Sequence, residues 1–221
     1  MKLRWILALA TLLALPGNLA HADAKSNSVV IALPTEPPGL DPTMQAPAPV
    51  SEVSWENILE GLTRYDASGK LTPGLALSWK LASPNAYEFK LRPGVKFHDG
   101  EAFTSVDVKF SFERNVSEKS TNKRKRVFAN IEKIEPPDPL TVLITLKKPS
   151  ALFPFDLAES TAAILSPKSV DSARTKPIGT GPYKFARWVQ GDSIDFERYA
   201  DYVGPVKPQI DKVTFRFMPD E

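Results

Sequence analysis

Few residues of this chain are suited to nucleophilic, redox or metal chemistry. Cysteine is absent, and the only histidines are His21 and His98. The lack of cysteine excludes disulfides, thiolate nucleophiles, Cys-ligated zinc and iron–sulfur clusters. His21 lies in an N-terminal segment that we expect to be removed, so His98 would have to serve any Ser-His hydrolase or histidine metal site. A lone histidine in a turn after Phe97 is more typical of a structural hydrogen bond. We therefore predict no enzyme activity and no cofactor.

A run of four basic residues at 123–126 is the other chemically marked segment. Such runs can bind nucleic acid or anionic lipid headgroups. The whole chain has a formal net charge of only +2, however, and removal of Lys2 and Arg4 with the N-terminal segment makes it formally neutral. This balance disfavours a nucleic-acid partner, and a solvated loop or helix edge is the simpler interpretation of the run.

The N-terminal segment 1–22 has the layout of a secretory signal peptide. A cationic start precedes an apolar run over 5–15, which Pro16 terminates. The small-x-small pattern at 20–22 predicts cleavage before Asp23. A membrane anchor is the alternative, but this run is much shorter than the ~20 apolar residues that a bilayer requires. Because no cysteine follows, we expect a soluble periplasmic protein and not a lipoprotein.

The hydropathy pattern predicts a mixture of strands and helices. The β-branched apolar run at 28–33 predicts a buried strand, and the proline-rich segment 34–42 after it cannot be helical. Apolar and charged side chains alternate at 87–92, as in a strand with one buried face. Further strands are expected at 62–65, 141–146 and 213–217, with a hairpin at 183–199.

Three helices are expected between these strands. Ser51 is suited to cap a helix that runs to about Glu60, and Thr104 and Asp107 have the spacing of a capping box before a helix that runs to about Asn115. A third, short helix at 151–159 would hold Pro154 in its first turn. The side chains expected to be buried on the first two helices are Val53, Ile58, Leu59, Val106, Phe110 and either Val108 or Phe112. We find no internal repeat, no Gly/Ser linker and no regular βαβ alternation.

Five motifs occur in a fixed order along the chain. They are L-D-P at 40–42, L-E-G-L at 59–62, the stretch P-G-L-A-L-S-W (73–79) with F-K-L-R-P-G-V-K-F-H-D-G (89–100), P-I-G-T-G-P-Y at 177–183, and the tail Y-A-D-Y-V-G to I-D-K-V-T-F-R-F at 199–217. Through them the chain resembles the extracytoplasmic solute-binding proteins of ABC importers for oligopeptides, dipeptides and nickel. Ser105 is a minor departure, since the family usually has alanine there.

The resemblance implies an α/β fold of the type II periplasmic-binding-protein class, in its large peptide-binding subclass. It divides the chain into a signal peptide (1–22), the first part of lobe I (23–45), an accessory domain inserted in lobe I (46–172) and a return to lobe I (173–221). Family members are more than twice as long, so we expect an amino-terminal fragment without the second lobe. The implied function is capture of peptides or related small solutes for membrane permease subunits, by a monomer.

The resemblance also indicates a candidate ligand-binding residue, Glu36, with its neighbour Pro37. Thr180, which lies between two glycines at the lobe edge, is a further candidate. Glu36 matches a position that faces the interlobe cleft, where a carboxylate would pair with a cationic ligand group. A solvated loop carboxylate is the alternative for Glu36, and a tight turn explains the glycines around Thr180 equally well. Trp55, Trp79 and Trp188 could stack on a ligand, although core packing is the commoner role of tryptophan. A truncated, nonfunctional remnant and a secreted hydrolase are the alternative functions.

Overall fold

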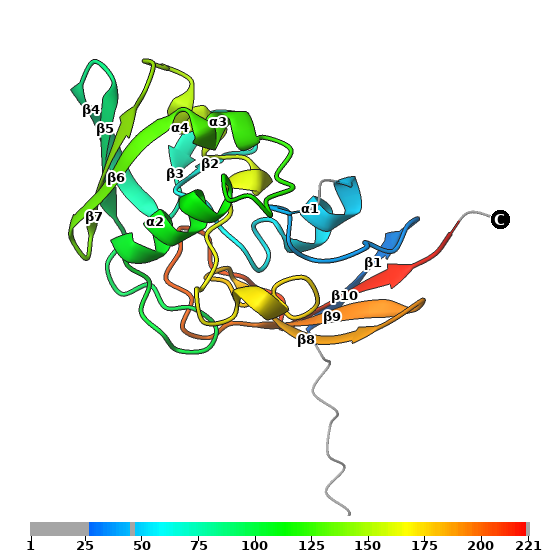
Figure 1. Ribbon diagram of the computed structural model, residues 1–221. Coiled ribbons are helices and arrows are strands. Elements are labelled where there is room, and N and C mark those ends of the chain that lie inside the picture. Colours follow the sequence, from blue (N-terminus) through cyan, green and yellow to red (C-terminus); the bar gives the residue numbers. More distant parts are fainter. Residues whose placement is uncertain (1–26, 45–46, 220–221) are drawn as a thin grey trace, which may run out of the picture.

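Two four-stranded sheets and a small two-stranded sheet form the framework of the computed structural model, which describes residues 27–44 and 47–219. The first large sheet has the order β1-β10-β9-β8 and lies at one end of the molecule (Figure 1). Its strands are β1 (Ser28–Leu33), β8 (Tyr183–Val189), β9 (Ser193–Arg198) and β10 (Lys212–Phe217). β1 and β10 are parallel, with Ile31 opposite Phe215, whereas β9 is antiparallel to both of its neighbours. The predicted hairpin and the pairing of the first and last strands in one sheet are thereby confirmed.

The second large sheet lies at the other end of the molecule and is antiparallel throughout. Its order is β4-β5-β7-β6, from β4 (Ala76–Ser83), β5 (Ala86–Leu91), β6 (Ile131–Asp138) and β7 (Thr141–Leu146). Helices α2 (Ser105–Arg114) and α3 (Lys125–Ala129) contact β6. The small sheet pairs β2 (Thr63–Tyr65) with β3 (Leu71–Pro73), next to α4 (Phe153–Asp156).

Each large sheet has its own apolar core. Beneath the second sheet, Phe89, Phe112 and Phe128 are almost fully buried among aliphatic side chains of β5, β7 and α2. The core of the first sheet combines strand residues such as Phe196 and Phe215 with Ile58 and other residues from the segment after β1. Two such cores are consistent with a lobe and an accessory unit. The domain boundaries at 45/46 and 172/173 stay a prediction.

The first helix differs from its prediction in position. It is α1 (Ala48–Ser54), which starts earlier because Pro49 is tolerated in the first helical turn, where its missing N–H costs nothing. It ends earlier because Trp55 is extended and Glu56 has a left-handed φ of 58°. The apolar side chains expected to be buried are buried nonetheless: Val53, Ile58 and Leu59.

The second helix follows its prediction more closely. The main-chain N–H of Thr104 donates to the Asp107 carboxylate at 2.7 Å, which is the interaction expected from the capping box. Val108 and Phe112 face the core, but the expectation that Val106 is buried is wrong, since its side chain lies on the solvent face. Phe110 is half-buried.

The strand β1 is also more exposed than its composition suggests. It is the edge strand of its sheet, and Val30 is 63% exposed, so the prediction of a buried strand is wrong for all but Leu33. The sequence pattern predicts β2, β5, β7 and β10. It does not predict β3, β4 and β6. Within the ranges described here, no helix has the length and apolar content needed to cross a bilayer. The predicted signal peptide lies outside them.

Candidate functional site

The loop after β1 begins at the edge of the first sheet where the parallel strands β1 and β10 both end. Leu33 is opposite Phe217 in the last pair of the register. The main-chain N–H of Met218 donates to the Leu33 carbonyl at 2.8 Å, which extends the pairing by one residue. In α/β sheets, ligands bind in the crevice outside the carboxyl ends of the strands. The loop 34–44 is therefore a candidate ligand-binding segment.

Glu36 in this loop is half-buried and its carboxylate is already engaged. The indole N–H of Trp188 donates to Oε1 at 2.8 Å, and the main-chain N–H of Gly191 donates to Oε2 at 3.1 Å. Both donors belong to the β8–β9 hairpin, so Glu36 ties the loop to that hairpin. The neighbouring Pro37 is buried. A carboxylate has room for further donors, because its two oxygens offer about four acceptor positions.

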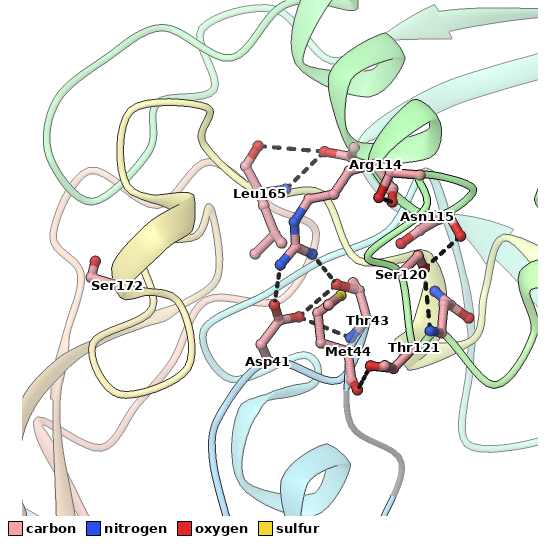
Figure 2. Close-up of polar contacts among 12 residues, drawn as sticks. Asp41, Thr43, Met44, Arg114, Asn115, Ser120, Thr121, Leu165 and Ser172 are labelled. Atoms are coloured by element: carbon pink, nitrogen blue, oxygen red, sulfur yellow. Dashed lines mark hydrogen bonds and ion pairs between the residues drawn. The ribbon is translucent and has the colours of Figure 1, made fainter.

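Farther along the loop, a buried ion pair connects it to the end of α2 (Figure 2). Asp41 is 2% exposed and accepts a bond of 2.8 Å from Arg114 Nη2. It also accepts from the main-chain N–H of Thr43 at 2.9 Å and from the Thr43 hydroxyl at 2.6 Å. Arg114 in addition donates to Thr43, and Thr121 donates to the Met44 carbonyl. This network fixes residues 41–44 against the end of α2 and the segment that follows it.

A hollow of about 370 Å³ lies beside this network. Its walls come from the loop, from the end of α2 and from the segment before β8, and they include Asp171 and Arg174, which are both exposed. Arg174 is held in place by donating to the Pro38 carbonyl at 3.3 Å, while its own carbonyl accepts from the Leu40 N–H at 2.8 Å. Charges of both signs at one rim are suited to a small zwitterionic or polar ligand.

Thr180 lies in a different cluster from Glu36. It is 1% exposed, and its hydroxyl donates to Glu60 Oε2 at 2.9 Å. The Tyr202 hydroxyl donates to the other oxygen, Oε1, at 3.1 Å. The structure thus places Glu36 and Thr180 in separate hydrogen-bond clusters, one at the hairpin and one at the crossover between the sheets.

His98 makes the structural hydrogen bonds expected of it. Its Nδ1 accepts from the Gly179 N–H at 3.3 Å, so its Nε2 carries the proton and donates to the Gly181 carbonyl at 2.9 Å. Burial lowers the pKa of the His98 imidazole to about 4. Among the residues that the structure describes, no three His, Cys, Asp or Glu side chains are grouped to hold a metal ion. The chemistry at His98 is therefore that of a neutral structural imidazole.

The remaining candidates from the sequence serve the fold. Trp55, Trp79 and Trp188 are all partly buried against the two cores. In the basic run, Arg124 pairs with Asp156 and lies 3.7 Å from Glu159, and Lys125 donates to the Ser117 carbonyl at 2.9 Å. Arg124 and Lys125 are thus engaged by neighbouring residues of the chain.

Sequence reasoning overlooked three polar residues: Asp41, Arg114 and Glu60. Asp41 and Glu60 lie within the L-D-P and L-E-G-L motifs, so the motifs held the signal although no role was assigned to them. Arg114 had no such signal. Its partner lies 73 positions away in the chain, and only the tertiary structure brings the two together.

Comparisons of the sequence and of the structure with known proteins agree on one family. A model described as "Bacterial extracellular solute-binding proteins, family 5 Middle" matches residues 70–221. The glutathione-binding protein GsiB of Pectobacterium atrosepticum is 34% identical over 218 residues, covering 96% of this chain and 42% of the relative. GsiB of Escherichia coli K12 is 33% identical over 220 residues, covering 97% of this chain and 42% of the relative. The chain thus spans about two fifths of the length of these relatives.

Solved structures with the same arrangement are also binding proteins. AgaA from A.tumefacien R10, in complex with agropinic acid, superposes with a TM-score of 0.81 at 35% identity, covering 86% of this chain and 40% of AgaA. NikZ from Campylobacter jejuni, in complex with Ni(L-His), gives 0.78 at 28% identity, covering 87% of this chain and 39% of NikZ. These likenesses confirm the predicted mixed α/β fold of a type II periplasmic binding protein. The family model matches well over half of the residues, and the chain therefore belongs to the bacterial extracellular solute-binding proteins of family 5.

Proposed function

We propose that this chain forms the solute-capturing lobe of an ABC importer's binding protein, which takes up peptides or related small solutes. The observation that carries the proposal is the position of the loop 34–44, which leaves the sheet where β1 and β10 both end. Glu36, Pro37 and Thr180 are the residues that we assign to the ligand side of this lobe. The protein acts by binding, with no covalent chemistry, and passes its solute to permease subunits in the inner membrane.

The relatives support a polar, peptide-like ligand. The GsiB proteins are named for glutathione binding, and one solved relative, DppA from Helicobacter pylori, holds the peptide STSA with a TM-score of 0.76 at 29% identity, covering 87% of this chain and 43% of DppA. Glu36 offers a carboxylate to an ammonium group, and Arg174 offers a guanidinium to a carboxylate. We further propose the division into signal peptide, lobe I and inserted accessory domain given above, with a monomeric product exported to the periplasm.

Affinity in such a protein requires ligand contacts from two sides. Binding costs several kcal/mol in lost translational and rotational freedom, and enclosure of the ligand must offset that cost. One lobe alone supplies only part of the contacts. We therefore expect this chain to bind peptides no more tightly than about 1 mM, or about −4 kcal/mol.

Amide NMR titration with glutathione and with a mixed di- and tripeptide set tests the proposal, because chemical shifts detect millimolar binding. We expect shifts at residues 34–44 and weaker binding in Glu36→Gln. The matched control is Glu132→Gln, an exposed carboxylate on β6 that should leave the titration unchanged. Absence of shifts in the loop, or saturable micromolar binding by this chain alone, would contradict the proposal. Amino-terminal sequencing of the product from fractionated cells tests export, with Asp23 as the expected first residue.

A further inference from the structure

Glu60 is a buried carboxylate on which three of the sequence motifs converge. It belongs to the L-E-G-L motif, it accepts from Thr180 of the G-T-G-P-Y motif at 2.9 Å, and it accepts from Tyr202 of the tail motif at 3.1 Å. Its residue is only 8% exposed. We call Glu60, Thr180 and Tyr202 the Glu60 cluster. It lies where the chain returns from the second sheet to the first.

The returning segment is held closely on both sides. The N–H groups of Gly181 and Tyr183 each donate at 2.9 Å, to the carbonyls of Ile58 and Asn57 respectively. A Cβ atom at Gly179 would lie 2.0 Å from the Ile58 carbonyl oxygen, so main chain packs directly on main chain. Glu60 bonds to Thr180 in the middle of this segment, so full exposure of its carboxylate to solvent requires the segment to move.

The charges around Glu60 do not neutralise it. Among the described residues, no cation forms an ion pair with Glu60. The hydrogen bonds from Thr180 and Tyr202 stabilise its charged form, and so do Arg64 and Arg92 from a greater distance. Burial dominates and raises the pKa of Glu60 to about 7. The other titratable or charged side chains lining the two hollows beside Glu60 are Glu56, Lys96, Tyr183, Asp201 and Tyr202.

One of these hollows has a volume of about 200 Å³, which is enough for several water molecules. Arg64 lines it, and the Arg64 Nε atom is buried without a hydrogen-bond partner among the described residues. A buried guanidinium N–H needs an acceptor, and a water molecule in the hollow would supply one. Glu60 lines the same hollow, so such a water would also carry a proton from Glu60 to solvent.

We propose that the Glu60 cluster is a proton-controlled clasp that holds the 179–183 segment against residues 57–60. When Glu60 is neutral, the clasp stays closed. When Glu60 is ionised, local opening becomes more frequent, because opening hydrates the carboxylate and the charged form gains most from hydration. Thr180 is one of the residues assigned to the ligand side of this lobe, so any effect of the clasp on solute binding rests on the proposed function, whereas the clasp itself does not.

Hydrogen exchange tests the clasp without any solute, so its outcome is independent of the proposed function. The readout is the protection factor of the Gly181 and Tyr183 amides, corrected for the intrinsic pH dependence of exchange. Between pH 5.5 and 8.5 we expect this protection to fall by about 30-fold in the unmodified chain. In Glu60→Gln the protection should be independent of pH. Glu56→Gln is the control, since Glu56 is a neighbouring carboxylate that pairs with Arg64 at 3.1 Å and should leave the pH dependence in place.

A second measurement does not depend on whether a variant folds. Carboxyl ¹³C NMR of the unmodified chain reports the titration of Glu60 directly, with an expected midpoint near pH 7. A midpoint near the ordinary value of 4.5 would overturn the proposal. A constant protection factor in the unmodified chain, or a pH dependence that persists in Glu60→Gln, would overturn it as well.

Discussion

The indole nitrogen of Trp188 donates a hydrogen bond of 2.8 Å to the carboxylate of Glu36, although the two residues are 152 positions apart in the chain. The bond joins the loop after the first strand to the β8–β9 hairpin, and the Gly191 N–H strengthens the connection from the hairpin turn. Hydrogen bonds to charged groups contribute more than neutral ones. The geometry of the candidate ligand loop therefore depends on a hairpin that is distant in sequence.

Replacement of Trp188 by Phe should loosen this loop. The change keeps an aromatic ring but removes the N–H donor, and we expect the free energy of unfolding to fall by about 1–2 kcal/mol. Urea denaturation measures the loss, and exchange of the Thr35 and Glu36 amides should become faster. Arg187→Met is the control, because Arg187 forms an exposed pair with Asp195 and such pairs contribute less than about 1 kcal/mol. Equal losses in the two variants would contradict this role of Trp188.

Removal of the Asp41 carboxylate should be more damaging. Asp41→Ala leaves the Arg114 guanidinium without its partner in a largely buried position, and we expect a loss of about 3 kcal/mol or more in unfolding free energy. Glu101→Gln breaks the exposed pair with Lys168 and should cost less than about 1 kcal/mol. In a double-mutant cycle with Arg114→Met, the two losses should be far from additive. Additive losses would show that the pair is not coupled.

The extent to which the sequence predicts this molecule depends on the range of the interactions involved. The capping box of α2 and the alternation of Tyr87, Phe89 and Leu91 are local patterns, and the structure confirms both. The exposure of β1 is not local. Its apolar composition resembles that of a central strand, but its place at the sheet edge is set by pairing with β10 nearly two hundred residues later.

The candidate site likewise combines local features that the sequence predicts with long-range contacts that it does not. The motifs identified the segments that carry Asp41, Glu60 and Thr180, but hydrogen-bond partners in distant segments cannot be read from spacing. Thr180 was selected for its place between two glycines, and its partner Glu60 lies 120 positions earlier in the chain. The end of α1 is unpredictable for a different reason. Glu56 has a left-handed backbone conformation, and the sequence does not indicate this because glutamate rarely adopts it.

The glycines of the G-T-G-P-Y motif should tolerate no side chain. In Gly179→Ala the new Cβ would clash with the main-chain carbonyl of Ile58, which cannot move without disturbing the crossover. We expect a loss of at least about 3 kcal/mol in unfolding free energy, or no folded product. Gly69→Ala is a demanding control, because Gly69 has a φ of 78° but open space around its Cβ position. That variant should fold and lose only about 1 kcal/mol.

The pH dependence of stability should reveal two opposing titrations at the crossover. Burial lowers the pKa of His98 from 6.5 to about 4, so between these values the unfolded state binds more protons and stability rises with pH. Burial raises the pKa of Glu60 from 4.5 to about 7, so between these values the folded state binds more protons and stability falls with pH. The windows overlap between pH 4.5 and 6.5. In this overlap the two slopes should nearly cancel. The combined contribution of His98 and Glu60 to the free energy of unfolding should therefore be almost independent of pH.

Single variants should separate the two titrations. In Glu60→Gln only the His98 slope remains, and the free energy of unfolding should rise by about 1 kcal/mol per pH unit across the overlap. In His98→Gln only the Glu60 slope remains, and the free energy should fall by a similar amount. Urea denaturation at half-unit pH steps measures both profiles relative to the unmodified chain. His98 bonds to the main chain of Gly179 and Gly181, and Glu60 bonds to the side chain of Thr180. Slopes of the same sign in the two variants would show that at least one of the two pKa values is not shifted in the direction that burial imposes.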